Sequence, residues 1–167
     1  MEPWHADDGR ARARHRFIEK VGLTFESVHL PRMSGRLLGA LLLGPAEGLT
    51  AAELASALDA SKASISSSTR LLVHYGFIER SVGSPDRRDR FVVSEDAWTR
   101  VLEERFEFLR SLRDLATDGL EQLDPSGDPR HLREARDMYG FLEREWPALI
   151  ERWEQSRHAP QHEGGEP

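Results

Sequence analysis

A long run of regularly spaced apolar residues near the C-terminal end constrains the fold more than any other feature. Between Leu132 and Trp153 these residues follow one another in steps of 3, 4, 3, 4, 3 and 4. This spacing places them on one face of a helix and is typical of a helix that packs lengthwise against another helix. The residues that we expect at a dimer interface are Leu132, Tyr139, Leu142, Trp146, Leu149 and Trp153.

The partner of this helix can belong to the same chain or to a second copy. Residues 94–123 also have the apolar spacing of a long helix and could pair with the seam within the chain. So much aromatic surface favours packing between two copies, involving residues 10–28, 94–123 and 128–155. Pro147 lacks an amide hydrogen and disfavours helix at Trp146, so we expect a kink or a restart there.

Composition narrows the possible classes of protein. The 167 residues suit one compact domain, with or without an appended arm, and the absence of cysteine excludes disulfides, thiolate metal sites and a thiol nucleophile. The longest apolar stretch, residues 37–46, is shorter than the roughly 20 residues that a membrane-spanning helix needs. No basic region precedes an apolar run, so we expect no signal peptide. We therefore expect a cytoplasmic protein without a membrane partner.

Enzyme and metal motifs are missing from the sequence. It contains no glycine-rich phosphate loop, no His-Glu-x-x-His and no Gly-x-Ser-x-Gly. His158 and His162 have helical ligand spacing, but they lie in a tail rich in Pro and Gly that favours solvated side chains. We expect no enzymatic activity, no metal and no cofactor.

Helix start and stop signals divide the rest of the chain. The apolar spacing predicts helices over residues 10–28 and 31–42, and Thr50 with Glu53 forms a capping box before a helix over residues 51–58. Ser61 is expected to cap a further helix that ends at Gly76. Short strands at 77–82 and 90–93 follow, joined by turn residues. The predicted fold is mainly α with a small β-wing.

Predicted domain organisation places two modules between disordered ends. We expect a winged helix-turn-helix, which would bind DNA, at residues 31–93 and a helical dimerisation module made of 10–30 and 94–156. Residues 1–9 and 157–167 are polar and are expected to be disordered.

The net charge of −6 is unevenly distributed along the chain. Residues 1–60 carry −1, residues 61–93 carry +3 and residues 94–167 carry −8. Salt limits electrostatic fields to about 8–10 Å, so a basic segment can bind phosphate within an acidic protein. The alternative for the arginine cluster is a solvated turn. The acidic total therefore does not exclude a nucleic-acid partner.

The basic segment has the order helix, turn, helix and hairpin that reads duplex DNA. The second helix would present short hydroxyl side chains that fit close to a duplex, although they could equally form a small solvated face. Arginines at the hairpin tip could enter a narrow minor groove, with Asp86 bracing one of them. The expected contacts with double-stranded DNA are Ser61, Lys62, Ser64, Ser66, Ser67, Arg70, Arg87, Arg88 and Arg90.

Two stretches carry a resemblance to a known family. The segment from Thr50 to Ser94, above all "GFIER" and "DRRDRFVVS", resembles the winged helix-turn-helix of MarR-type transcriptional regulators. The preceding "FIEKVGLTFESVHLPRMSGRLLGALLL" resembles the GbsR-like branch, which includes regulators of mycobacterial lipid-efflux operons. The resemblance covers roughly residues 14–156. It implies a homodimer that binds an operator, usually as a repressor, with Arg88 entering the groove.

The resemblance also implies relief by a small, often apolar, ligand where the two modules meet. The apolar residues expected to line such a pocket are Phe17, Val21, Phe25, Met33, Leu37, Phe106 and Leu109. The alternative is that these side chains simply form the core. Four arginines at positions 10, 12, 14 and 16 could touch DNA, but a solvated helix start is favoured.

Two classes of function follow. The first is a homodimeric, ligand-responsive regulator that binds DNA. The second is a dimeric winged-helix module that contacts proteins and has no sequence-specific DNA binding. The acidic total charge and the plain, serine-rich helix support the second class.

Overall fold

The computed structural model describes residues 4–81, 89–122 and 127–158 of the chain. The described chain separates into two compact units, one up to Val101 and one from Leu102 onward. The fold is mainly helical with one small antiparallel sheet, which confirms the predicted fold class. Within the described ranges, no helix is long and apolar enough to cross a membrane.

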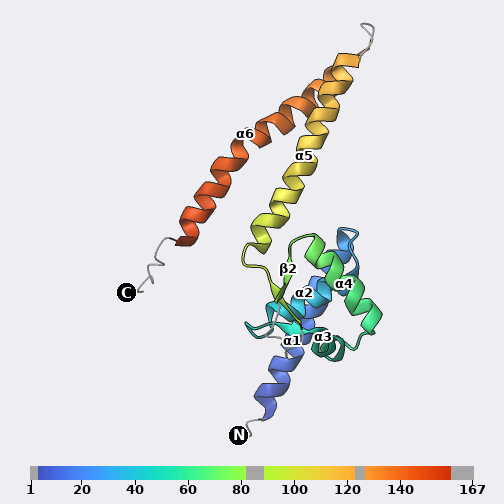
Figure 1. Cartoon of the computed structure of the whole chain (residues 1–167), viewed down its shortest axis with the longest axis vertical. Helices are drawn as coiled ribbons and strands as arrows, with labels where there is room; N and C mark the ends of the chain where they lie inside the picture. Colours follow the sequence, from blue (N-terminus) through green and yellow to red (C-terminus); the bar gives the residue numbers. More distant parts are fainter. Residues whose placement is uncertain (1–3, 82–88, 123–126, 159–167) are drawn as a thin grey trace. The chain divides into compact units, whose positions relative to one another are not determined.

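Four helices and the sheet form most of the first unit (Figure 1). The helices are α1 (Trp4–Ser27), α2 (Arg32–Leu42), α3 (Ala51–Leu58) and α4 (Lys62–His74). The strands are β1 (Leu49–Thr50), β2 (Ile78–Ser81) and β3 (Arg90–Val93), in the order β1-β3-β2. The pairs Leu49–Phe91 and Ile78–Val93 set the register. Strand β1 was not predicted, because two residues are too short to show an alternating pattern.

Local signals define the helix-turn-helix as predicted. The Thr50 hydroxyl accepts the Glu53 amide at 3.2 Å, and the Glu53 carboxylate accepts the Thr50 amide at 2.7 Å. The Ser61 hydroxyl accepts the Ser64 amide at 3.2 Å. Gly76 follows α4 with φ +70°, a conformation that glycine adopts without strain. Such caps each stabilise a helix by about 1 kcal/mol.

Helix α1 packs on α2 and belongs to the first unit. Its Ile18 and Phe25 join the core around Leu37, Leu54 and Leu72. The two helices approach closely at Gly35, where an added Cβ would lie 2.6 Å from a carbonyl oxygen of α1. The expected module that joined residues 10–30 to 94–156 differs from this division. The reason is the close contact between α1 and α2, which a reading of local sequence patterns does not reveal.

The N-terminal end also differs from the expectation. Helix α1 begins at Trp4, so part of the stretch 1–9 that was expected to be disordered is helical. Residues 1–3 lie outside the described part.

Two long helices form an antiparallel hairpin. Helix α5 (Ala97–Gln122) begins in the first unit and supplies residues 102–122 of the second, where α6 (Arg130–His158) runs back along it. Leu132 lies against Gly119, and the rings of Trp146 and Phe106 stack with centroids 3.6 Å apart. Leu132 and Trp146 of the predicted seam therefore face different parts of the same α5 helix.

Helix α6 continues through Pro147 without a restart, which corrects one of the two outcomes expected there. It also extends to His158, two residues beyond the expected boundary at 156. The missing amide of Pro147 costs one hydrogen bond, but the flanking turns remain helical. Residues 159–167 of the expected tail lie outside the described ranges.

Candidate nucleic-acid interface

The outer side of α4 presents polar side chains to solvent, as the sequence predicts. Ile65, Thr69 and Leu72 are buried on the opposite side. Ser68 also belongs to this buried side and is only 4% exposed. The exposed residues, which we call the reading face, are Ser61, Lys62, Ser66, Ser67 and Arg70; Ser64 is half-buried.

Hydrogen bonds to the helix backbone order this reading face. The Ser67 hydroxyl donates to the Ser64 carbonyl at 3.0 Å, and Thr69 donates to the Ser66 carbonyl at 3.1 Å. The Arg70 Nε donates to the Ser66 carbonyl at 3.3 Å, which holds the guanidinium along the helix. These bonds reduce the freedom of short side chains before any ligand binds. The face is therefore partly organised in the free protein.

Arg80 extends the positive surface beyond α4. It lies on β2 with its side chain 60% exposed, 3.2 Å from the Asp89 carboxylate. Its guanidinium carbon lies 5.8 Å from the centre of the Phe91 ring. A hollow of about 420 Å³ brings together residues of α3, α4 and the sheet: Thr50, Ala51, Ala52, Lys62, Ser66, Thr69, Arg80, Asp89 and Phe91. Two cations and three hydroxyls at one hollow suit a phosphate group, which would compete with the Asp89 carboxylate for Arg80.

Arg80 is not among the DNA contacts predicted from the sequence. It contributes there only to the net charge of +3 of residues 61–93. The pairing of Arg80 with Phe91 across the sheet is what brings it to the same hollow as Lys62. Alternation along a four-residue strand gives too weak a signal to find this from the sequence.

Arg90 has structural partners in the free protein. Its Nε donates to the Gly48 carbonyl at 3.2 Å, and its terminal nitrogen lies 3.3 Å from the Glu53 carboxylate. The same carboxylate forms the capping box with Thr50. Arg90 thus connects β3 to the start of α3. Its contact with DNA remains a prediction.

The wing tip lies outside the described residues. Asp86, Arg87 and Arg88 fall in the segment 82–88, so the groove-entering role of Arg88 stays a prediction.

The residues expected to line a ligand pocket fall in both units. In the first unit, Phe25 and Leu37 are core residues, and Val21 and Met33 pack against that core. Phe17 is 39% exposed and lines a shallow groove beside Arg10, Arg14 and Leu43. In the second unit, Phe106 stacks on Trp146 and Leu109 is half-buried on α5. Membership of the core accounts for Phe25 and Leu37, and the ligand pocket remains a prediction.

The predicted dimer residues divide into two groups. Leu132, Tyr139, Leu142 and Trp146 are half-buried. Leu132 and Trp146 contact α5, as the alternative of packing within the chain requires. Leu149 and Trp153 remain 49% exposed. Met138 and Phe141, which are not among the predicted interface residues, are 57% and 51% exposed and lie three residues apart beside the seam.

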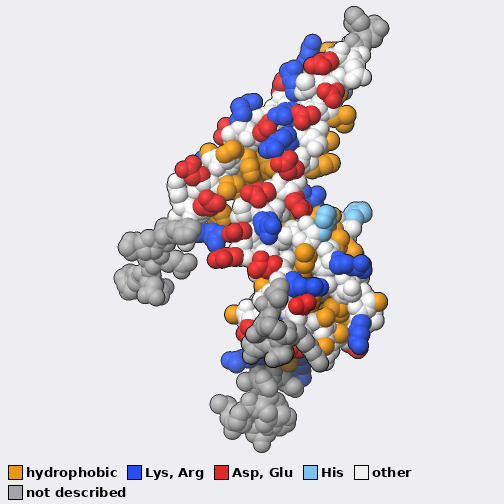
Figure 2. Space-filling view, viewed as in Figure 1, with side chains coloured by type: hydrophobic (Ala, Val, Ile, Leu, Met, Phe, Trp, Pro, Cys, Tyr) orange, Lys and Arg blue, Asp and Glu red, His pale blue; other side chains and the backbone are white. Residues whose placement is uncertain are grey.

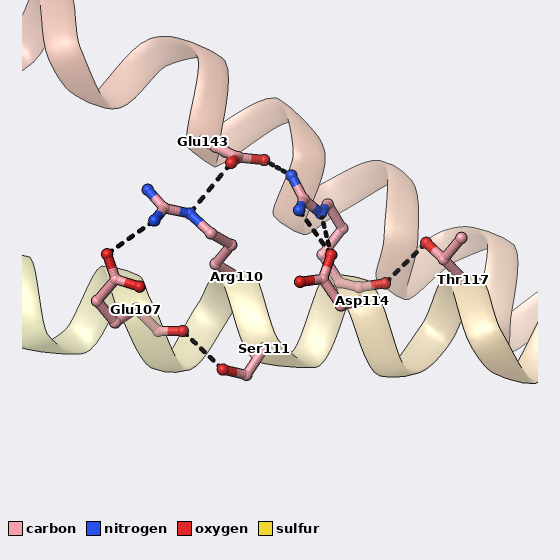
Figure 3. Close-up of polar contacts among 7 residues, drawn as sticks. Glu107, Arg110, Ser111, Asp114, Thr117 and Glu143 are labelled. Carbon is pink, nitrogen blue, oxygen red and sulfur yellow. Dashed lines mark hydrogen bonds and ion pairs between the residues drawn. The ribbon is translucent and has the colours of Figure 1, made fainter.

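An ion-pair cluster joins the two long helices (Figure 3). Glu143 of α6 lies between two arginines of α5, with the Arg110 Nε at 3.1 Å and Arg113 on its other oxygen. Arg110 also pairs with Glu107 at 2.7 Å, and Arg113 pairs with Asp114 at 2.6 Å. One acidic residue is thus shared by two cations, which helps to align α6 along α5. Figure 2 shows charged and hydrophobic side chains intermingled on these helices.

The helix-turn-helix, its three-stranded sheet and the exposed reading face together define a winged-helix DNA-binding protein. A family model described as MmpR5-like MarR family transcriptional regulator matches residues 96–157. The HTH-type transcriptional regulator MmpR5 of Mycobacterium tuberculosis is 42% identical over 129 residues, covering 76% of this chain and 78% of that protein.

A solved structure agrees with this similarity. The crystal structure of a transcriptional regulator is 38% identical, covers 86% of this chain and 99% of its own, and has a TM-score of 0.75. The chain belongs to the MarR family of transcriptional regulators, and it is similar to the MmpR5-like members. It is therefore a transcriptional regulator with a DNA-binding helix-turn-helix, not an enzyme. The resemblance identified from the sequence is confirmed.

Proposed function

We propose that the protein is a homodimeric repressor that binds operator DNA in the cytoplasm and is released by a small apolar or amphipathic molecule. The observation that carries this proposal is the reading face beside the hollow formed by Lys62, Ser66 and Arg80. Hydroxyls and cations at one surface match the phosphates and base edges of a major groove.

The proposed contacts divide by role. Lys62 and Arg80 bind phosphates, which positions α4 without selecting a sequence. Ser64, Ser66, Ser67 and Arg70 approach base edges from the N-terminal half of α4. Ser61 caps this helix by accepting the Ser64 amide, which fixes where α4 begins. Arg87 and Arg88 are assigned to the minor groove from their positions in the sequence.

Homodimer formation is supported by apolar surface that the hairpin of α5 and α6 leaves open. Apolar side chains on these helices, about half or more exposed, are Leu102, Phe108, Leu115, Met138, Phe141, Leu149 and Trp153. Exposed apolar surface of this kind usually marks an interface. A two-fold dimer would place two copies of α4 about 34–36 Å apart, one turn of DNA. Sedimentation of the Phe141→Glu variant tests this, and a dimer unchanged by the substitution would contradict the proposed interface.

The test of DNA binding is a fluorescence-anisotropy titration with the DNA upstream of the gene. Lys62→Ala should weaken binding about tenfold on all sequences, as loss of a phosphate contact does, and should flatten the salt dependence. Arg133→Ala provides the matched control, because Arg133 is an exposed arginine on α6, outside the reading face. Absence of sequence-selective binding at low salt would favour a protein-interaction module instead.

Repression and ligand release need separate measurements. Deleting the gene should raise transcription from the bound promoter if the protein is a repressor. Deletion would lower transcription if the protein were an activator. An effector should weaken DNA binding if it binds the DNA-free conformation more tightly than the DNA-bound conformation. Amphipathic and aromatic compounds are the first to screen, since Met33 and the phenylalanines dominate the expected pocket.

A further inference from the structure

One arginine connects three helices of the first unit. The Arg36 Nε lies 2.7 Å from the Glu19 carboxylate of α1. Its terminal nitrogen donates to the Leu58 carbonyl at 3.2 Å. Arg36 itself belongs to α2, and its side chain is only 20% exposed. One edge of the planar guanidinium therefore contacts Glu19 of α1, and a terminal nitrogen binds Leu58, the last residue of α3.

The α3 end of this link adjoins the turn that orients α4. Asp59 follows Leu58 with φ +48°, and the Ala60 amide donates to the Ala55 carbonyl at 3.0 Å. Ser61 then caps α4. Because only two residues separate Leu58 from this cap, a shift of the Leu58 carbonyl changes the direction in which α4 leaves the turn. A cation at the C-terminal end of α3 is also favoured by the helix dipole.

The α1 end of the link is firmly anchored. Glu19 also accepts a hydrogen bond from Arg32 at 2.7 Å. Near Glu19, the backbones of α1 and α2 touch at Gly35, so α1 cannot slide without disturbing α2. The Glu19 carboxylate is therefore held in place, and Arg36 connects it to the turn.

We propose that Arg36 is a positioning residue that couples α1 to the turn between α3 and α4 and so sets the orientation of the reading face. This rests on the proposed function for its effect on DNA, but the coupling itself is a property of the free protein. Displacement of α1 would then reach the turn before α4 through this side chain, in addition to the direct packing of α2 against α4.

Hydrogen exchange of the full-length protein tests the coupling directly. Arg36→Met should speed exchange of the Asp59 and Ala60 amides about tenfold, the change expected for one lost charge-assisted hydrogen bond. Glu19→Gln should speed exchange at the same amides, although Glu19 does not bond to the turn. Arg32→Met is the matched control. Arg32 also pairs with Glu19, but its removal leaves the contact between Arg36 and Glu19 in place. It should leave exchange at the turn unchanged.

A second measurement separates positioning from general stability. Arg36→Lys keeps the charge but cannot span both partners with one ammonium group, so it should preserve the thermal midpoint better than Arg36→Met while weakening operator binding. Unchanged exchange at Asp59 and Ala60 in Glu19→Gln would overturn the coupling. Equal effects of Arg32→Met and Arg36→Met would also overturn it. If the wild-type protein bound no operator, the proposed function would fail, and the exchange comparison would still decide the coupling.

Discussion

The arginines of the first unit differ in the acceptor that each side chain binds. Arg80 pairs with an exposed carboxylate on the sheet, and Arg70 bonds along its own helix. Arg90 and Arg36 instead each bond to a backbone carbonyl near an end of α3. Bonds from a charged group to a partly buried carbonyl contribute more to stability than exposed ion pairs do. Arginines with the same charge therefore have separable effects on folding and on DNA binding.

We expect Arg90→Met to reduce the free energy of unfolding by about 1–2 kcal/mol, because the Gly48 carbonyl and the Glu53 carboxylate both lose a partner. Arg80→Met should change stability by less than about 0.5 kcal/mol, since Arg80 is exposed, but should weaken DNA binding. Urea denaturation of both variants checks this. Equal losses of stability would contradict the structural role of Arg90.

At the scale of elements, α6 tolerates a residue that usually breaks helices. Pro147 is exposed, and the helix runs on for eleven residues beyond it to His158. The stack of Trp146 on Phe106 and the cluster around Glu143 hold α6 against α5 on the N-terminal side of the proline. Tertiary contacts thus override the local preference of the chain.

Pro147→Ala should stabilise the protein, by about 1–3 kcal/mol, because it restores one helical hydrogen bond and removes a clash with the preceding turn. Thermal denaturation followed by circular dichroism measures the change. Glu145→Ala, an exposed helical substitution two residues earlier, is the control and should have little effect. A lower midpoint for Pro147→Ala would mean that the proline has a packing role on α6.

At the scale of the whole molecule, one carboxylate connects stability to pH. The hydrogen bond from Arg32 lowers the pKa of Glu19 below its ordinary value of 4.5; burial opposes this shift, and nearby Arg36 adds to it. A lowered pKa means that Glu19 stabilises the fold above its ordinary value and that this contribution is lost as pH falls through the folded-state value.

Glu19→Gln should therefore be less stable than the wild type at neutral pH, and this difference should shrink as the pH is lowered below 4.5. Urea denaturation at a series of pH values measures it. Glu104→Gln, on the exposed side of α5, is the control for a carboxylate without this pair of arginines. A difference that stayed constant down the pH series would exclude the ion pairs as its source.

Elements whose signals are local could be predicted from the sequence. The capping box at Thr50, the cap at Ser61, the glycine after α4 and the exposed side of α4 all depend on neighbours within a few residues. The family resemblance in the wing and helix-turn-helix belongs to the same category. These features placed the reading face correctly on the solvent side of α4.

How these elements combine depends on contacts between residues that are far apart in the sequence. Strand β1, the position of Arg80 beside Lys62 and the link from Glu19 through Arg36 to Leu58 each join residues that are far apart in the chain. The packing of α1 on α2 likewise depends on a backbone approach at Gly35. Sequence periodicity reports which side of an element is apolar, but it does not report which partner covers that side. That choice depends on close packing among distant residues, and it determined which arginines stabilise the fold and which remain exposed.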